Sequence, residues 1–594
     1  MIDFRRNNLD RADSLYLRQH AENPIWWQEW SSAVVEESVR RNIPLFVSVG
    51  YAACHWCHVM ASEAFSDQAT ADYMNRHFIC IKVDRDERPD IDQDLMRYQT
   101  AQKGSGGWPL NAFLTPRLDP FFALTYAPAH PNPRMKSFLE IAQAVNGYFQ
   151  EEGGREFPFR SAEESPDLAG DDPGVETLVS FFDHGHGGLG SGAKFPPHSI
   201  LLYLLYRLCV EEHSGASRAC NLTLEAMRRG GLHDHLQGGI FRYCVDRAWT
   251  VPHFEKMLYD QAMALWAYAL AFRVFRKAAD KSMAEGLIRC LEETFERDGL
   301  FIAAYDADTL HVEGGTYLWR YDDLAEALTS EEFAAFQGVY RIERGGNFEG
   351  LIHLIRKTDA PLPEIEKKLL AIRLRRPQPA ADDKILCGLN ALTAVSLIQA
   401  GRLLNRVELE KKADRLAHRL WDLFWDGGAL AHSLSHGHVR KNAFLFDAAA
   451  LLLAVSMLYE NDESWLKPLE ALTEHLGSFK NGESWVESRA EDFRPVTASR
   501  FDHPIPSSAA LAEMVMAREA LRRGRDLQPA PYRRPGEADF ANIAVMMRNG
   551  LFHVITAKTR VSWNRLPPNT LRLLGDPESD CYRGACRILK LRKE

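Results

Sequence analysis

Cys54 and Cys57, separated by two residues, have the residue types and the spacing that point most directly to chemistry in this chain. A thiolate attacks disulfides, and a second thiol three positions along can resolve the mixed disulfide that forms. If Cys54 begins a helix, unpaired backbone N–H groups and the helix dipole favour its thiolate. Positive charge on His55 and His58 would lower the pKa of Cys54 further and stabilise the reduced pair, which makes the pair more oxidising. The spacing therefore predicts thiol–disulfide exchange.

The segment that contains these cysteines, CHWCH, also fits three other interpretations. It matches the C-x-x-C-H pattern of haem attachment, but the strand and helix signals around it and the cytosolic composition argue against haem. A metal site on Cys54, Cys57 and a histidine is the second interpretation, yet no second ligand pair at zinc spacing lies nearby in the sequence. The third is an inert cysteine pair in a scaffold or in a domain that holds a substrate. We favour redox chemistry, with no metal and no cofactor.

Strand and helix signals alternate around the cysteines between residues 1 and 155. Residues 43–50 form a short apolar run with β-branched side chains, which predicts a buried strand before Cys54. The other expected elements are a helix at 33–41, a helix from the cysteines to about residue 75, and strands at 78–83, at 110–114 and from Phe121. This order is that of a thioredoxin-like α/β domain. Trp108 and Pro109 stand where that fold places a cis-proline beside its redox cysteines, so Pro109 is a candidate site residue.

The second region, residues 172–594, is dominated by long helical segments and follows a polar linker expected at 156–171. The main expected helices are 200–212, 216–229, 255–277, 283–297, 391–404, 408–424, 443–459 and 507–523. Several are apolar on every side and must be fully buried, whereas 408–424 has one polar face. These two kinds of helix predict the inner and outer rings of a two-layered helical barrel.

Loops between these helices carry glycines, acids, histidines and aromatic residues, and we expect some of them to meet in a cleft. The candidates for this cleft are Arg242, Asp246, Trp249, His253, Glu255, Asp306 and Asp308. Paired carboxylates near a histidine suit proton transfer at a sugar carbon or a glycosidic oxygen, and Trp249 or Trp319 could stack on a pyranose. Structural roles compete with these. Glu255 would complement a helix dipole, and Lys256 and Asp260 would form an i,i+4 ion pair.

A set of motifs together resembles a known family. The motifs are Cys54–Met60 (CHWCHVM), Gly106–Asn111 (GGWPLN), Lys194–Pro196 (KFP), Val251–Gln261 (VPHFEKMLYDQ), Asp306–Asp308 (DAD), Gly346–Gly350 (GNFEG) and Asp382–Leu386 (DDKIL). On these residues the chain resembles, along almost its whole length, the family named after spermatogenesis-associated protein 20. The resemblance implies a multidomain fold. A thioredoxin-like α/β domain would be followed by an all-α domain, an (α/α) toroid similar to those of six-hairpin glycosidases and sugar 2-epimerases.

The late part of the chain departs from the pattern of that family. Leu389–Ala391 stands where Trp-Asn-Gly is expected, Leu445–Asp447 lacks one carboxylate, and Pro506–Ala509 lacks Gly-Asn after Pro-Ser. These changes remove polar groups from the expected toroid cleft and weigh against a carbohydrate activity. Near the C-terminus, Cys581 and Cys586 fit either a disulfide or two free thiols.

Composition and charge narrow the classes of binding partner and the cellular compartment. The net charge of −10 argues against a broad nucleic-acid surface. The N-terminus lacks the apolar run of a secretory signal, and the most apolar stretch, 448–458, is about half a membrane span. Ten mostly scattered cysteines are typical of a reducing compartment. We expect a cytoplasmic protein whose partner is a protein thiol client or a small-molecule or sugar ligand, with no nucleic acid and no membrane.

Three function classes follow from these observations. The first is a thioredoxin-type thiol–disulfide oxidoreductase whose toroid binds a client or a small molecule. The second is a carbohydrate-active enzyme, a sugar epimerase, isomerase or hydrolase that uses the toroid cleft. The third is a non-catalytic scaffold. The intact pair of Cys54 and Cys57 favours the first class.

Overall fold

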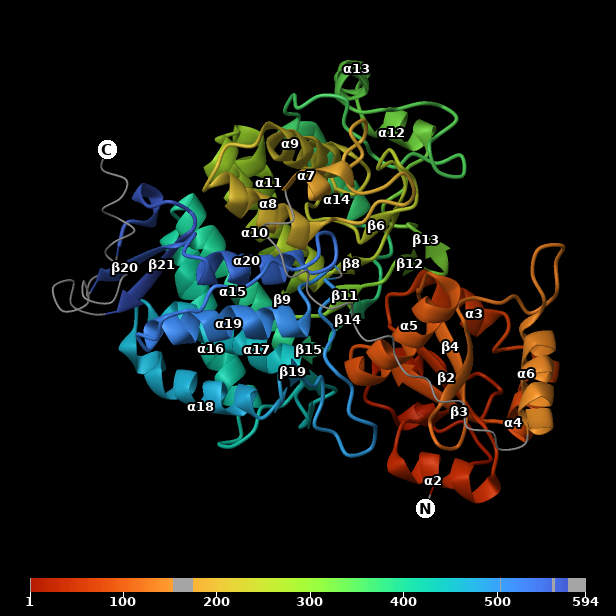
Figure 1. Cartoon of the computed structure of the whole chain (residues 1–594). Coiled ribbons are helices and arrows are strands. Elements are labelled where there is room, and N and C mark those ends of the chain that lie inside the picture. Colours follow the sequence, from red (N-terminus) through yellow and green to blue (C-terminus); the bar gives the residue numbers. More distant parts are fainter. Residues whose placement is uncertain (1, 153–174, 503, 558–560, 575–594) are drawn as a thin grey trace.

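The computed structural model of the protein describes residues 2–152, 175–502, 504–557 and 561–574. It has an α/β part at the N-terminus, red to orange in Figure 1, and a larger helical part from yellow to blue. The linker expected at 156–171 and the pair Cys581 and Cys586 lie outside the described residues.

A five-stranded sheet forms the centre of the N-terminal part. Its strands are β1 (Gln28–Glu29), β2 (Leu45–Gly50), β3 (Ile79–Asp84), β4 (Leu110–Leu114) and β5 (Pro120–Leu124), in the spatial order β1-β3-β2-β4-β5. The first three strands are parallel, and β4 runs antiparallel to both β2 and β5. Every residue of β2 and β3 is buried, as expected for strands covered on both faces. This arrangement is a thioredoxin-like fold.

Helices cover both faces of this sheet. They are α2 (Ser32–Arg41), α3 (His55–Ser62), α4 (Gln68–His77), α5 (Pro89–Lys103) and α6 (Phe138–Glu152). The single helix expected from the cysteines to about residue 75 is in fact two, α3 and α4. The break has a local cause, because Asp67 caps α4 by accepting a hydrogen bond from the backbone N–H of Thr70 at 2.7 Å.

Six helices of the second part close into a ring. They are α8 (His198–Leu208), α10 (Leu258–Phe275), α15 (Cys387–Leu404), α17 (Leu445–Tyr459), α19 (Ser508–Arg522) and α20 (Asp539–Arg548). Each packs on the next in this order, and α20 packs back on α8. By length and composition α15 alone, among the described helices, is apolar enough to cross a membrane, but it is buried inside this ring. An apolar helix of this kind is the core of the domain.

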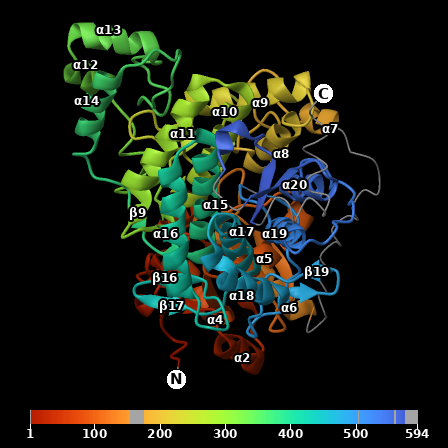
Figure 2. The same ribbon diagram turned by 90° about the vertical axis from the view of Figure 1, so that its left-hand side faces the viewer.

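Four helices form an outer layer around the ring. They are α9 (Ser214–Arg229), α11 (Ala278–Cys290), α16 (Val407–Phe424) and α18 (Leu466–Gly477), and each packs on the inner helix that precedes it. The polar face of α16 points outward, as its sequence predicts. The domain is therefore an (α/α) toroid, and Figure 2 shows α16 and α18 outside the inner helices.

A small helical insertion stands apart from the toroid. It consists of α12 (Tyr321–Ala327), α13 (Ser330–Val339) and α14 (Pro363–Arg373), which share a hydrophobic core of their own. Figure 2 shows these helices projecting beyond the outer layer.

The thioredoxin-like domain lies on the rim where the inner helices begin. Short strands form this rim, among them β6 (Tyr243–Cys244), β7 (Pro252–His253), β8 (Lys256–Met257), β11 (Ala304–Tyr305), β12 (Asp308–Thr309), β13 (Val312–Glu313), β14 (Ala381–Asp382) and β15 (Ile385–Leu386). Met257 and Tyr259, at the start of α10, share a buried cluster with Cys54 and Cys57. The rim and the cysteine motif therefore meet (Figure 1).

Candidate functional site

Cys54 and Cys57 form a disulfide at the first turn of α3. Cys54 is the N-cap residue, and its Sγ accepts a hydrogen bond from the backbone N–H of Cys57 at 3.2 Å. At this position the unpaired N–H groups of the helix stabilise negative charge on the sulfur. Both cysteines are buried in the assembled chain, at 2% and 1% exposure.

Pro109 follows a cis peptide bond and lies at the end of β4 nearest the cysteines. Leu110 pairs with Val49 of β2, the strand that leads into the cysteine motif. The neighbouring Trp108 donates a hydrogen bond to Asp92 at 2.7 Å. The guanidinium of Arg85 lies 4.2 Å from the centroid of the Trp108 ring. The cis-proline of a thioredoxin-like site is thus present.

Both histidines of the motif find carboxylate partners on the toroid. His55 Nδ1 lies 2.8 Å from Asp308 Oδ1, and His58 Nε2 lies 3.1 Å from Asp306 Oδ1. Between these two contacts, the backbone N–H of Ala307 donates to the carbonyl of Ala53 at 3.4 Å. The β11–β12 segment of the toroid therefore lies directly against α3.

These pairs change the charge beside Cys54. Burial lowers the pKa of His55, but its hydrogen bond with Asp308 and the charge of Glu313 outweigh burial, so its pKa is raised. The pKa of His58 is raised for the same reason, because the hydrogen bond and charge of Asp306 outweigh burial. The raised pKa of each histidine favours its cationic form, and a positive charge there favours a neighbouring thiolate, with the counter-charge on the toroid.

Arg242 and Glu255 form a buried network with Tyr51, three residues before Cys54. The hydroxyl of Tyr51 donates to Glu255 Oε2 at 2.8 Å and contacts the guanidinium of Arg242. Arg242 pairs with the same carboxylate oxygen at 3.1 Å. Burial raises the pKa of Glu255, and the charge of Arg242 opposes that rise. Glu255 precedes α10 instead of lying in its first turn, so the expected dipole role is wrong.

His253 lies on β7 and contacts the carboxylate of Glu313 on β13. Its ring lies 6.0 Å from the ring of His55, measured between centroids. Of the seven toroid candidates, Arg242, His253, Glu255, Asp306 and Asp308 therefore gather at the cysteine motif.

Asp246 and Trp249 serve local structure instead. Asp246 accepts hydrogen bonds from the backbone N–H groups of Val251 at 2.7 Å and Ala248 at 2.9 Å, which stabilises a turn. The indole of Trp249 is 1% exposed and donates to the carbonyl of His186 at 3.1 Å. Trp319 is also 1% exposed. The expectation that either tryptophan stacks on a sugar is therefore wrong, because neither has a free ring face.

Lys256 and Asp260 do not form the expected i,i+4 pair. Lys256 lies on β8, before α10 begins, and its Nζ donates to Asp234 at 2.6 Å. Asp260 instead faces His198 of α8, with 3.5 Å between Oδ1 and Nε2. The side chains of Asp260 and His198 are both fully buried.

Tyr51, Arg85 and Glu313 also belong to this site, although they are not among the residues predicted from the sequence. Tyr51 directly follows the strand predicted at 43–50, and Arg85 directly follows the observed β3, so position at a strand end was the available signal. Glu313 stands at no recognisable motif. In the described parts of the chain, no cluster of three potential metal ligands occurs.

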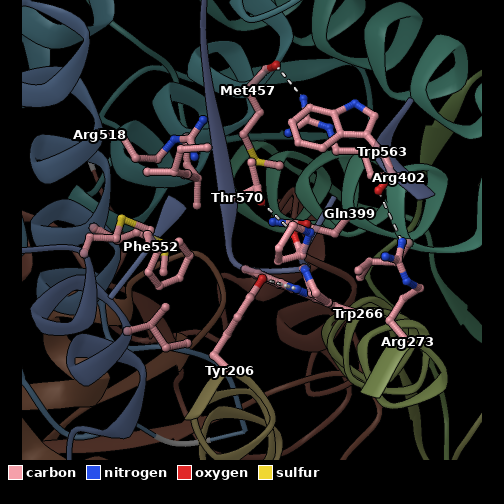
Figure 3. Close-up of a pocket in the computed structure, with 18 residues that line it drawn as sticks. Tyr206, Trp266, Arg273, Gln399, Arg402, Met457, Arg518, Phe552, Trp563 and Thr570 are labelled. Atoms are coloured by element: carbon pink, nitrogen blue, oxygen red, sulfur yellow. Dashed lines mark hydrogen bonds between the residues drawn. The ribbon is translucent and has the colours of Figure 1, made fainter. Parts of the chain in front are cut away.

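A cavity lies at the opposite end of the toroid, and residues of all six inner helices line it (Figure 3). Arg273, Arg402 and Arg518 lie around it. Arg402 donates to the carbonyl of Met457 at 3.0 Å, and Arg273 donates to that of Leu566 at 2.8 Å. Arg402 and Arg273 therefore satisfy carbonyl groups at a helix end and in the C-terminal segment, whereas Arg518 pairs with Glu460.

Comparisons with known proteins agree with this organisation. Residues 6–163 match the family model Thioredox_DsbH, described as "Protein of unknown function, DUF255". The uncharacterized protein B0495.5 of Caenorhabditis elegans is 30% identical over 98% of this chain and 89% of its own length. Spermatogenesis-associated protein 20 of Rattus norvegicus is 30% identical over 78% of this chain and 68% of its own length.

Two solved structures resemble the toroid remotely. One is a sugar epimerase from a ruminal bacterium, with a TM-score of 0.30 and 13% identity over 63% of this chain and 96% of its own. The other is the GH76 α-mannanase BT2949 of Bacteroides thetaiotaomicron, with a TM-score of 0.35 and 10% identity over 64% of this chain and 93% of its own.

Proposed function

This chain belongs to the spermatogenesis-associated protein 20 family, and we propose that within it Cys54 and Cys57 carry out thiol–disulfide exchange on a thiol client. One observation carries the proposal: the disulfide sits at the N-terminus of α3, between two histidines that toroid carboxylates hold in place. An inert cysteine pair would not require this charged surrounding.

The exchange proceeds in two steps. The thiolate of reduced Cys54 attacks a client disulfide, so that a bond to the client sulfur forms and the other client sulfur leaves as a thiolate. Cys57 then loses its proton and attacks Cys54, which re-forms the internal disulfide and releases the second client thiol. Two electrons pass from the cysteine pair to the client, and the reverse sequence oxidises a client dithiol.

The protein's own residues support these steps through position and charge. The Sγ of Cys54 accepts a hydrogen bond from the backbone N–H of Cys57, and the raised pKa values of His55 and His58 favour positive charge beside it. Pro109, directly before β4, borders the same end of the sheet. The toroid contributes Asp306 and Asp308, so its role here is to complete the redox site.

The same contacts weigh against a carbohydrate site on this rim. Glu255, Asp306 and Asp308 already bond to Tyr51, His58 and His55 of the thioredoxin-like domain. With Trp249 and Trp319 buried, the rim also lacks the stacking surface that a sugar site was expected to use. We therefore do not propose sugar chemistry.

Single cysteine variants test the proposal. We expect Cys54→Ser to reduce exchange with a dithiol or disulfide substrate to background, because the attacking thiolate is gone. We expect Cys57→Ser to accumulate a mixed disulfide, which intact-mass spectrometry detects. The matched control is Cys209→Ser, at the far end of α8, which should keep wild-type exchange. Exchange that persists in Cys54→Ser would refute the proposal.

A further inference from the structure

Six aromatic rings form a continuous path across the junction of the two domains, beside the cysteines. We call Tyr126, Trp56, His55, His253, Tyr243 and Phe195 the aromatic path. Successive centroids lie 5.1, 5.6, 6.0, 4.7 and 4.3 Å apart in that order. The first three rings belong to the thioredoxin-like domain and the last three to the toroid. The path therefore exists only when the two domains are docked.

Large apolar side chains of the path face solvent near both of its ends. Trp56 is 41% exposed, and Phe195, stacked on Tyr243, is 45% exposed. Val245, just after β6, is 49% exposed. Between these ends His253 is only 7% exposed, so the exposed apolar area consists of the two ends of the path, and two such areas beside the cysteine pair indicate an interaction surface.

The β12–β13 hairpin adds a second apolar feature next to this path. Its turn residues Leu310 and His311 have φ values of 51° and 63°. A turn with positive φ at both central residues favours Asn-Gly, so leucine and histidine here are strained. Leu310 is 76% exposed and Val312 is 54% exposed. The strained turn therefore presents apolar side chains to solvent.

The hairpin is tied to the aromatic path through its charged residues. Asp308 of β12 binds His55, and Glu313 of β13 contacts His253. Figure 1 shows the hairpin at the junction, between β6 and α3. Leu310 is thus held close to the middle of the path.

The dimensions and the charge of this surface indicate its occupant. Five steps of 4.3 to 6.0 Å form a path comparable in length with an extended peptide of ~7 residues at ~3.4 Å each, much longer than a small disulfide. The carboxylates along it are Glu63, Asp306, Asp308 and Glu313, opposite the histidines His55, His58 and His253. Arg242, whose guanidinium lies 5.9 Å from the centroid of the Tyr243 ring, is balanced by its ion pair with Glu255, so these carboxylates leave a negative border.

We propose that the aromatic path and the β12–β13 hairpin bind an extended polypeptide segment whose reactive cysteine lies among apolar and basic side chains. The proposal rests on the thiol–disulfide function above and names its substrate class. The apolar side chains pack on the rings and on Leu310, and the basic side chains face the carboxylate border. The peptide cysteine then lies beside Trp56, two positions from Cys54 in the sequence.

Binding without exchange tests the surface directly. The probe is a fluorescent nonapeptide with a central serine in place of cysteine, flanked by phenylalanine, leucine and lysine, added to the full-length Cys54→Ser/Cys57→Ser protein. We expect Phe195→Ala and Leu310→Ala in that background each to raise the Kd about tenfold. A peptide with glutamate in place of lysine should bind at least tenfold more weakly.

Matched controls use equally exposed residues elsewhere. Phe501→Ala, in the loop before α19, and Leu374→Ala, after α14, remove side chains that are 43% and 51% exposed. We expect the Kd of each control variant to stay within twofold of the Kd of the Cys54→Ser/Cys57→Ser protein. An unchanged Kd in both Phe195→Ala and Leu310→Ala, or no binding of the lysine peptide at all, would overturn the proposal. A dimer that Phe195→Ala dissolves would also overturn it, in favour of a second copy of the chain.

Kinetics separate this proposal from the underlying function. With the cysteine pair intact, Phe195→Ala should raise the KM for a disulfide-linked form of the peptide about tenfold. It should leave the rate with bis(2-hydroxyethyl) disulfide unchanged. If the wild-type protein exchanges neither substrate yet the serine peptide binds, the redox function fails and the docking surface stands. If both substrates react and Phe195→Ala has no effect, the docking surface fails and the function stands.

Discussion

At the scale of single residues, the histidines of the cysteine motif depend on the other domain. Asp306 lies about 250 residues from His58 in sequence and yet sets its charge. A histidine whose pKa is raised in the folded protein contributes stability that is fully present below its unfolded pKa of ~6.5. That contribution is lost as the pH rises through the folded value. Domain docking and the charge beside Cys54 are therefore linked through the same side chains.

Asp306→Asn tests this link. We expect the pKa of His58 to fall, because burial remains and its hydrogen-bonded anion is gone. The variant should lose about 1 kcal/mol of stability at about pH 5.5 and much less at about pH 8.5. Histidine NMR titration and urea unfolding at both pH values measure these changes. Asp308→Asn is the matched control and should move the pKa of His55 more than that of His58. An unaltered His58 titration in Asp306→Asn would contradict the assignment.

At the scale of elements, the β12–β13 hairpin has a strained turn that exposes an apolar side chain to solvent. Its strands hold Asp308 and Glu313 toward the histidines, and its turn holds Leu310 in solvent. A turn of this shape would be more stable with Asn-Gly, the residues that tolerate positive φ. A role of the Leu310 and His311 side chains in peptide binding would explain why these residues occupy the turn although they lower the stability of the fold.

Replacing the turn separates the two roles. We expect Leu310→Asn/His311→Gly to raise the free energy of unfolding by about 1 to 2 kcal/mol, because both strained residues are relieved. Chemical denaturation of the variant and the wild type measures this gain. Binding of the lysine peptide should weaken in the same variant, since Leu310 is absent. A variant that is less stable than the wild type would show that the turn is not strained.

At the scale of the whole molecule, one buried lysine joins the two domains. Lys384, just before β15, lies 2.6 Å from Asp84 and 3.4 Å from Asp86 of the thioredoxin-like domain, and 3.1 Å from Asp382 of the toroid. All four groups lie in the junction, and burial raises the pKa of Asp382 to about 7 although Lys384 opposes it. Three carboxylates around one ammonium are stable only while that ammonium is present.

Lys384→Met should therefore destabilise the docked molecule strongly. We expect a loss of about 3 to 5 kcal/mol near pH 8, because the buried carboxylates lose their counter-charge. The loss should shrink toward pH 5, where Asp382 can be protonated. Thermal and urea unfolding across this range measure the effect. Lys368→Met, which removes an exposed ion pair with Glu332, is the control and should cost less than about 1 kcal/mol. Equal losses in the two variants would show that the junction does not depend on Lys384.

Local patterns by themselves determined the class of each element. The strand at 110–114 has the bounds expected from its apolar run, and the polar face of α16 identified an outer helix. The condition that Cys54 begins a helix is met, because Cys54 is the N-cap residue of α3. These features depend on residues a few positions apart, which is the range over which periodicity and capping act.

Other elements were missed because their local signals are weak. α18 has Pro468 near its start, which resembles a helix breaker, and α20 is short and follows a segment rich in Gly and Pro. The helices of the insertion bury only a small core of their own. In each case the apolar face is defined by a neighbour that the sequence does not show.

The tertiary structure alone decided which candidate residues belong to the site. Trp249 and His253 are only four positions apart and both are buried, yet Trp249 packs in the toroid core whereas His253 lies against His55 of the other domain. The partner of His55 is Asp308, far away in sequence. The physical reason is that closure of the helical ring places the start of α10 and the β12–β13 hairpin on one rim, against α3. A buried charge must find a partner wherever the fold brings one, and no local pattern encodes that partner.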